Sequence, residues 1–260
     1  MAVRFDFNDK NVLVIGGTSG INLGIAEAYA ASGAQLGVAG RKQEKIDAAL
    51  PRLSRHGKEA VGYSLDVRNP EAVADAIARF AQRFGPIDVL VSGAAGNFPA
   101  RATDLSPNGF RAVVEIDLLG TFHVMRAAYA HLVKPGACVI NISAPQAFIA
   151  SPMQVHVCAA KAGVDMITRT LAIEWGPDGV RINSVTPGPI DGTEGMQRLA
   201  PTEAIRKKVV ESVPMRRMGT PDDVAQVCLF LASDAGRYVS GTVIPVDGAW
   251  STSGASLQLS

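Results

Sequence analysis

The sequence has few cysteines, no metal-binding spacing and no long apolar run, and each absence excludes a class of protein. Cys138, Cys158 and Cys228 form no CxxC pair, and an odd number of scattered cysteines argues against a disulfide framework. The four histidines stand in no HExxH or HxH arrangement with carboxylates at ligand spacing, so no metal site is expected. No apolar run approaches the roughly 18 residues of a membrane span, so no membrane partner is expected.

An excess of charge of one sign is also missing. The 260 residues contain 25 Lys and Arg against 24 Asp and Glu, a net charge of +1, so no nucleic-acid partner is expected. A hydrophobic content of 47% indicates a globular chain with a large interior. The N-terminal string MAVRFDFNDK has no signal or transit character and the C-terminal SLQLS is not a peroxisomal address, so a cytoplasmic location is expected.

Short apolar runs alternate with alanine-rich helical stretches along the whole chain. The predicted strands are 11–16, 35–40, 60–65, 88–93, 137–143, 181–186 and 242–247. Helical apolar spacing is clearest over 70–84, 106–133 and 155–175. Because parallel neighbours need right-handed crossovers, this alternation predicts an α/β fold, a doubly wound parallel sheet of Rossmann type covered on both faces. No linker or repeat interrupts it, which indicates a single domain over residues 1–260.

Two segments near the C-terminus have recognisable roles. Residues 188–213 form an excursion between the sixth strand and the last helix, and Met196 and Leu199 could belong to an apolar lid over a substrate. A helical hairpin that serves subunit packing is the alternative. The last helix is expected to begin at Thr220, because Thr220-Pro221-Asp222-Asp223 supplies a cap, a proline at the first position and acidic residues at the positive end of the helix dipole.

A glycine-rich turn follows the first predicted strand. Gly16-Gly17-Thr18-Ser19-Gly20-Ile21-Asn22-Leu23-Gly24 lies between that strand and a helix. Glycine is needed where backbone must turn sharply and approach a pyrophosphate, and the free N–H groups at the helix start then hold the anion. The position of the cluster within a strand–helix–strand unit predicts a dinucleotide cofactor.

The end of the second predicted strand indicates which dinucleotide binds. NAD sites place a carboxylate there for the ribose hydroxyls, whereas NADP sites place cations there for the 2′-phosphate. This sequence has Gly40 at the acid's position and Arg41 beside it, so NADP(H) is the expected cofactor. Asp66, after the third strand, could bind the adenine amino group or could simply form a turn.

At this point the chain resembles the short-chain dehydrogenase/reductase superfamily over nearly its whole length. The matching strings are GGTSGI, LDV, AAG, a lysine in the helix after the fifth strand, PGPI and SGTVIPVDGAW. The resemblance implies cofactor contacts by residues from several strand ends, namely Gly16, Ser19, Gly20, Ile21, Arg41, Asp66, Val67, Gly96, Lys161, Pro187, Gly188 and Ile190. Asn22 stands where the usual turn has glycine, and Gly93 and Ala94 replace the paired asparagines of the usual NNAG.

The catalytic positions depart further from the usual pattern. Most members carry a tyrosine four residues before the lysine, where this chain has Val157, and a serine where it has Ala144. The variant with tyrosine seven residues before the lysine is excluded by Gln154. A tyrosine-dependent alcohol dehydrogenase is therefore not expected.

One branch that lacks this tyrosine, the 2,4-dienoyl-CoA reductases and particularly the peroxisomal type, is similar in AAGNF, LSPN, IDLLGTF, QVHVCAAKAGVD, AIEWGP and PGPIDGTEG. The resemblance implies reduction of 2,4-dienoyl-CoA to 3-enoyl-CoA in fatty-acid metabolism, an acyl-CoA substrate and a homotetramer. It places Asp117 where the usual pattern has asparagine, and makes Asp117 and Lys161 the catalytic candidates. It further implies substrate contacts by the set Arg68, Phe98, Ser106 and Asn108.

Several alternatives remain open from the sequence. Ser143 could bind the thioester oxygen or cap an element, and His156 points away from Lys161 if the helix has begun, because five residues place it about 140° around the axis. The chain could reduce another enone or acyl thioester, on CoA or on acyl-carrier protein, or could bind NADP without catalysis. Asp117 could serve as an acid or only order water.

Overall fold

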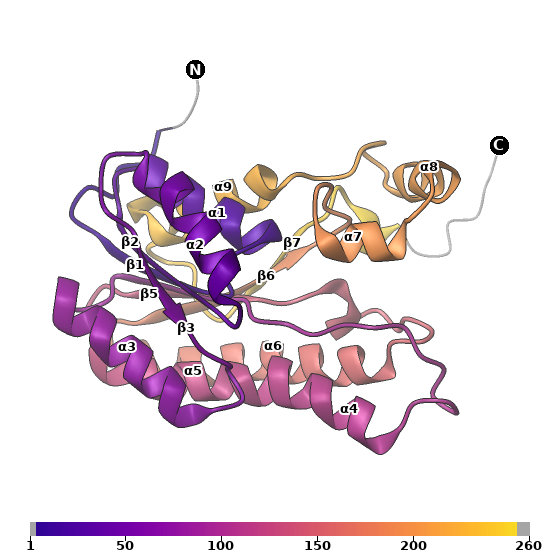
Figure 1. Ribbon diagram of the computed structural model, residues 1–260, viewed down its shortest axis with the longest axis horizontal. Coiled ribbons are helices and arrows are strands. Elements are labelled where there is room, and N and C mark those ends of the chain that lie inside the picture. Colours follow the sequence, from indigo (N-terminus) through magenta and orange to yellow (C-terminus); the bar gives the residue numbers. More distant parts are fainter. Residues whose placement is uncertain (1–3, 254–260) are drawn as a thin grey trace.

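The computed structural model describes residues 4–253, and its centre is a seven-stranded parallel sheet (Figure 1). The strands are β1 (Asn11–Ile15), β2 (Gln35–Gly40), β3 (Val61–Ser64), β4 (Val89–Ser92), β5 (Cys138–Ile142), β6 (Arg181–Pro187) and β7 (Val243–Val246). Their order across the sheet is β3-β2-β1-β4-β5-β6-β7. The predicted doubly wound α/β fold is thereby confirmed, and each strand end lies within one residue of its predicted position. The string SLQLS lies outside the described residues.

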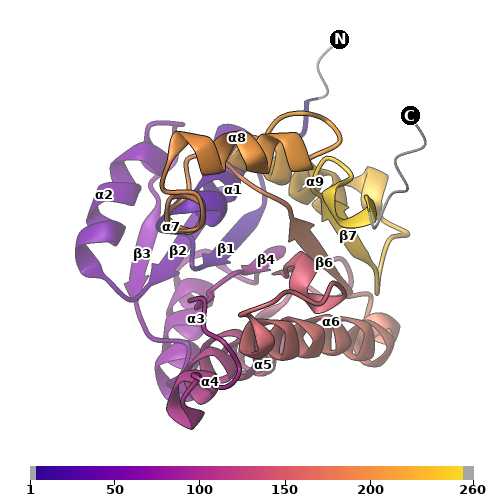
Figure 2. The same cartoon turned by 90° about the vertical axis from the view of Figure 1, so that its right-hand side faces the viewer.

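Helices cover both faces of the sheet (Figure 1, Figure 2). On one face are α1 (Gly20–Ala31), α2 (Gln43–Ser54) and α9 (Pro221–Ala232). On the other are α3 (Pro70–Phe84), α4 (Pro107–Val114), α5 (Gly120–Ala128) and α6 (Val155–Trp175). Side chains of β1 alternate between the two apolar cores, with Val12 and Val14 facing α1 and α9, and Leu13 and Ile15 facing α3 and α5. This burial on both faces explains why the strand reads as a continuous apolar run.

The helix predicted over 106–133 is wrong in two respects. A π-helical segment, Glu115–Leu119, separates α4 from α5, and helical structure ends with a 3-10 turn at Tyr129–His131. Beyond it the N–H of Val133 donates to the carbonyl of Ile87 at the approach to β4, so the chain there pairs with the sheet. Apolar spacing continued through both features and could not reveal either.

The segment 188–213 leaves the sheet after β6 and carries α7 (Glu194–Leu199) and α8 (Glu203–Ser212), which lie on the side of α1 and α2 (Figure 2). The cap predicted for the last helix is confirmed. Thr220 Oγ1 accepts from the Asp223 N–H at 3.2 Å, and Asp223 Oδ2 accepts from the Thr220 N–H at 2.7 Å. Between residues 4 and 253, no helix combines the length and the apolar character that crossing a bilayer requires.

Candidate active site

Two adjoining cavities open at the carboxyl ends of the strands, where the order reverses between β1 and β4. The first has a volume of about 370 Å³ and the second about 330 Å³. Both are lined by Ser19, Asn22, Gly93, Ala95 and Glu194, so they form one continuous cleft. Such a crevice at a topological switch point is where open α/β sheets bind their ligands.

The glycine-rich turn forms the floor of the cleft. Gly16 and Gly20 have φ values of +82° and +56°, which side-chain-bearing residues rarely adopt. A Cβ on Gly16 would lie 2.9 Å from the backbone nitrogen of Ala94, so the turn packs directly against the end of β4. Ser19 is the N-cap of α1 and its side chain makes no capping bond, which leaves the first N–H groups of α1 facing the cleft. This arrangement fits a pyrophosphate.

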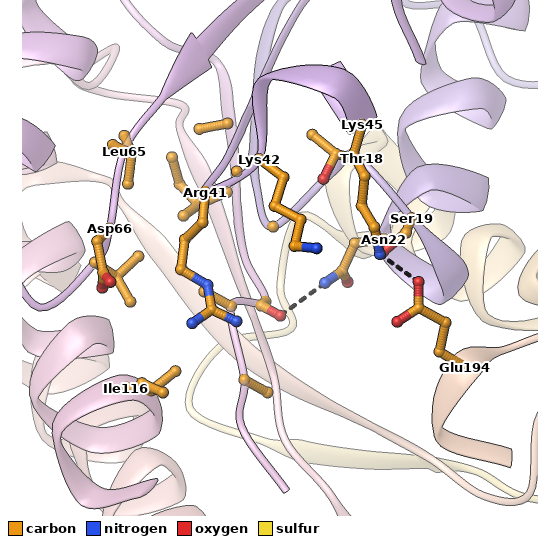
Figure 3. A pocket seen from close by; sticks show the side chains of 18 of the residues that line it. Thr18, Ser19, Asn22, Arg41, Lys42, Lys45, Leu65, Asp66, Ile116 and Glu194 are labelled. Atoms are coloured by element: carbon orange, nitrogen blue, oxygen red, sulfur yellow. Dashed lines mark hydrogen bonds and ion pairs between the residues drawn. The ribbon is translucent and has the colours of Figure 1, made fainter. Parts of the chain in front are cut away.

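Cations gather in the first cavity, at the end of β2. Arg41 and Lys42 extend into it opposite Asp66 (Figure 3). At the neighbouring Gly40, a Cβ would lie 2.7 Å from Thr18 Oγ1, so a carboxylate side chain could not occupy this position without displacing Thr18. The residues present therefore fit a phosphate-bearing adenosine better than one recognised through its ribose hydroxyls.

Asp66 does not stand alone in this cavity. Arg68 Nη2 donates to Asp66 Oδ2 at 2.6 Å, and the guanidinium holds the pKa of that carboxyl below its usual range. Arg68 is absent from the residues that line either cavity, so the structure places this predicted substrate contact against Asp66 instead. Asp66 thus remains a candidate acceptor for the adenine amino group, and Arg68 places a positive charge beside it.

Three charged residues of this cavity were missed by the sequence reasoning. Lys45, Glu194 and Arg198 all line it, and Lys45 donates to Glu194 across the gap between α2 and α7 (Figure 3). The Lys45 ammonium lowers the pKa of the Glu194 carboxyl. Lys45 lies in the first turn of α2, close after Arg41 and Lys42, and could have been found from that position. Glu194 and Arg198 could not, because only the folding of 188–213 over α2 brings them there.

Asp117 and Lys161 meet in the second cavity. Asp117 is 1% exposed and Lys161 5%, and Asp117 Oδ2 lies 3.3 Å from Lys161 Nζ. The other carboxylate oxygen, Oδ1, accepts from the Gly96 N–H at 2.7 Å, while Lys161 Nζ donates to the carbonyl of Ile142 at 3.0 Å. Among the described residues Asp117 Oδ2 makes no hydrogen bond of good geometry beyond this ion pair, so it keeps accepting capacity toward the cleft.

The π-helical segment explains how Asp117 reaches the cleft. It begins where α4 ends and contributes Ile116 to the first cavity and Asp117 to the second. A π turn places an extra residue in the helix and shifts the side chains that follow it. π turns are frequent at functional sites, and this one turns a buried carboxylate toward Lys161 on α6.

Val157 and Ser143 complete the second cavity. Val157 is buried and lies on the Lys161 side of α6, so an apolar side chain occupies the place of the usual tyrosine. Ser143 ends β5, and within residues 4–253 its hydroxyl makes no hydrogen bond of good geometry. It does lie near Asp165, whose pKa is raised by burial, an effect that Ser143 and Ser184 only partly offset. Ser143 lines the cleft beside Asp165, and its one hydroxyl proton can go either to that carboxyl or to a ligand.

The cofactor residues predicted from the resemblance are largely brought together. Gly16, Ser19, Arg41, Asp66 and Val67 line the first cavity. The second is lined by Ser19, Gly20, Ile21, Gly96, Lys161 and Pro187. Gly188 and Ile190 line neither cavity, since Gly188 packs on Asp247 and Ile190 is buried against Gly219.

Three of the predicted substrate residues, Phe98, Ser106 and Asn108, line neither cavity. Phe98 and Ser106 meet at Gly109, where an added Cβ would contact both at 3.2 and 3.3 Å. Ser106 Oγ caps α4 by accepting from the Gly109 N–H, and Asn108 is exposed in the first turn of α4. The buried His156 donates from Nε2 to the Phe98 carbonyl oxygen at 3.0 Å, so His156 supports Phe98 and does not line the cleft.

No metal site accompanies these groups in the part of the chain that the structure describes, where no three His, Cys, Asp or Glu side chains converge as ligands would.

Comparison with known proteins identifies relatives over most of the chain. A family model described as enoyl-(acyl carrier protein) reductase matches residues 16–251. A peroxisomal 2,4-dienoyl-CoA reductase [(3E)-enoyl-CoA-producing] of Arabidopsis thaliana is 44% identical over 246 residues, covering 91% of this chain and 82% of that protein. A probable 2,4-dienoyl-CoA reductase [(2E)-enoyl-CoA-producing] of Bacillus subtilis (strain 168) is 38% identical over 242 residues, covering 92% and 95%.

Solved structures agree with these relatives. A short chain dehydrogenase from Bacillus anthracis str. 'Ames Ancestor' superposes with a TM-score of 0.85 at 36% identity, covering 94% of this chain and 97% of that one. A citronellol catabolism dehydrogenase of Pseudomonas aeruginosa PAO1 gives a TM-score of 0.84 at 33% identity, covering 96% and 98%.

Proposed function

The chain belongs to the short-chain dehydrogenase/reductase superfamily and is an oxidoreductase of the 2,4-dienoyl-CoA reductase-like kind, and from this premise we propose that it reduces a 2,4-dienoyl-CoA to a 3-enoyl-CoA with NADPH. One observation carries the proposal. The cleft pairs Asp117 with Lys161 while Val157 occupies the place of the tyrosine that serves carbonyl reduction. The site therefore retains a proton source and lacks the donor that a ketone needs.

Conjugate reduction and ketone reduction require the protein to place its hydrogen-bond and proton donors at different atoms of the substrate. A bound reduced nicotinamide would supply the hydride, which in a dienoyl thioester would add to the far end of the diene. The electron pair displaced through the double bonds then places negative charge on the thioester oxygen, and a hydrogen-bond donor must stabilise that charge. Ser143 offers a hydroxyl at the cleft for this purpose.

Asp117 and Lys161 supply the proton that completes the reaction. A proton delivered to the α-carbon, directly from the Asp117 carboxyl or through a water held by the pair, gives the 3-enoyl thioester. The Gly96 N–H fixes Oδ1, so the second oxygen alone exchanges the proton. Lys161 lies close enough to stabilise the carboxylate left behind, and we also assign it the contact to the nicotinamide ribose that the family resemblance implies.

Purified protein incubated with NADPH and a panel of thioesters tests the proposed function. We expect rapid NADPH oxidation with a trans-2,trans-4-dienoyl-CoA and much slower oxidation with a 3-ketoacyl-CoA, because Val157 cannot donate a proton to a ketone oxygen. A simple secondary alcohol with NADP should likewise react slowly. Turnover of ketoacyl-CoA without dienoyl activity would contradict the proposal.

The position of the double bond in the product is a second readout of the same assay. Protonation at the α-carbon leaves a 3-enoyl thioester, whereas protonation two carbons further leaves a 2-enoyl thioester. The names of the two relatives differ in this respect, since one is (3E)-enoyl-CoA-producing and the other (2E)-enoyl-CoA-producing. Mass spectrometry and NMR of the product decide between them, and a 2-enoyl product would place the acid beside the γ-carbon.

We also propose that the chain forms a homotetramer, and an exposed apolar face offers a surface for one of its interfaces. Leu119, Phe122, Met166 and Ile173 are exposed on the π-helical segment, α5 and α6, and Ile173 is 79% exposed. These elements lie side by side on one face of the molecule (Figure 1). Apolar surface of this kind on long helices favours a two-fold interface between identical chains.

Light scattering behind size exclusion tests this assembly. We expect the mass of four chains for the unmodified protein and a smaller species for Ile173→Glu, because a carboxylate in an apolar interface loses its water without gaining a partner. Ile205→Glu on α8 is the matched control, since Ile205 is also exposed but lies elsewhere. A monomeric unmodified protein at micromolar concentration would contradict the proposal.

A further inference from the structure

The structure joins two sequence features that looked unrelated. Asn22 stands in the first turn of α1, and Gly93 follows β4, 71 residues later. Asn22 Nδ2 donates to the carbonyl oxygen of Gly93 at 2.7 Å (Figure 3). This bond ties the start of α1 to the end of β4 across the floor of the cleft.

Gly93 is required by Asn22. A Cβ built on Gly93 would lie 2.4 Å from Asn22 Nδ2, 2.6 Å from Oδ1 and 2.7 Å from Cγ. Real Cβ atoms do not approach other atoms so closely, so a larger residue at position 93 would have to displace the Asn22 amide and break its bond to the Gly93 carbonyl. The Asn22 amide, carried by α1, therefore fills the space beside the end of β4. Gly93 leaves room for it because glycine has no side chain.

One end of that amide has no partner. The bond to Gly93 fixes the orientation of the side chain, because a carbonyl oxygen accepts only from the amide nitrogen. Asn22 Oδ1 is then left buried without a hydrogen bond among residues 4–253. A buried acceptor in this state is costly unless a ligand or water donates to it.

The position of Asn22 indicates which part of a dinucleotide would donate. Asn22 lines both cavities, between the Arg41 end and the Lys161 end. A pyrophosphate held by the first N–H groups of α1 would present only acceptor oxygens and would repel Oδ1. In a dinucleotide, the hydrogen-bond donor nearest to the pyrophosphate is a hydroxyl of a ribose.

We propose that Asn22 is a cofactor-binding residue, whose Oδ1 accepts a hydrogen bond from a hydroxyl of the ribose on the nicotinamide side, and that Gly93 is its structural partner. The assignment concerns the half of the cofactor that NADH and NADPH share. It therefore does not depend on the proposed preference for NADPH or on the proposed thioester substrate.

Fluorescence titration of Asn22→Gly tests the binding role. We expect this variant to bind NADPH and NADH about fivefold to tenfold more weakly, the range of one lost hydrogen bond, with the same factor for both. Binding of 2′,5′-ADP, which lacks the nicotinamide ribose, should change less than about twofold. Unchanged affinity for both reduced cofactors would overturn the proposal, and an equal loss for 2′,5′-ADP would overturn the ribose assignment.

A double-mutant cycle tests the partnership of the two residues. Gly93→Asn alone should lower the melting temperature steeply, because two amides compete for one space. Combining it with Asn22→Gly should restore much of that loss, since one amide then remains. Additive effects of the two changes on the melting temperature would overturn the partnership, whatever the cofactor measurements show.

Discussion

Replacing Asp117 by asparagine is expected to lower turnover of a dienoyl-CoA by about a hundredfold or more, the scale of a lost general acid. Asparagine keeps the shape of the side chain, and its Oδ1 can still accept from the Gly96 N–H. The oxygen beside Lys161 becomes an amide nitrogen, which cannot exchange a proton with the substrate. Steady-state kcat with saturating NADPH and dienoyl-CoA measures the effect.

A separate titration distinguishes chemistry from positioning. The affinity for NADPH should stay nearly unchanged in Asp117→Asn if the carboxyl acts on the substrate, because Lys161 keeps its bond to the Ile142 carbonyl. Glu115→Gln is the matched control, since Glu115 lies in the same π-helical segment and lines neither cavity. Near-normal turnover would remove the acid role, and a loss confined to cofactor affinity would make Asp117 a positioning residue.

Arg41→Ala is expected to weaken NADPH binding by about tenfold to a hundredfold, the value of a guanidinium–phosphate pair. Binding of NADH, which lacks the 2′-phosphate, should change little. The unmodified protein should accordingly bind NADPH more tightly than NADH by a similar factor. Fluorescence titration of both reduced cofactors measures these affinities, and Arg79→Ala, which removes a cation on α3 outside the cleft, is the control for the change in net charge.

The crowding at Gly40 gives the converse test. Gly40→Asp should not by itself convert the protein to NADH, because the new side chain meets Thr18 Oγ1 at 2.7 Å and disturbs the turn. Thr18→Ala in the same chain should relieve the contact and allow some NADH binding to return. Equal affinity for NADH and NADPH in the unmodified protein would contradict the NADP assignment.

The elements of the fold could be predicted because each depends on a local pattern. Apolar runs of four to seven residues specified the strands, and the cap at Thr220 specified where α9 begins. Gly16 and Gly20 of the turn adopt the positive φ that a tight approach to a phosphate needs. Arg41, which follows β2, and Lys161, which lies in α6, were brought to the cleft as expected.

The departures from family pattern were also visible in the sequence, but their meaning was not. Val157 showed that the usual tyrosine is missing, and Asn22 and Gly93 were separate irregularities. Only the structure shows that Asn22 and Gly93 share one space. It also shows that Arg68 is held by Asp66 and that Ser106 caps α4.

The sequence by itself determined the succession of strands and helices along the chain, the cofactor turn and the candidate catalytic pair, since these follow from periodicity, backbone preference and matching strings. The tertiary structure decided which side chains face one another: Asp117 turned inward by a π segment, and Lys45 joined to Glu194 of the segment after β6. The reason is physical. Hydrogen bonds and ion pairs act over a few ångströms in space, and residues such as 22 and 93 become neighbours only when the strand order of the sheet brings them together.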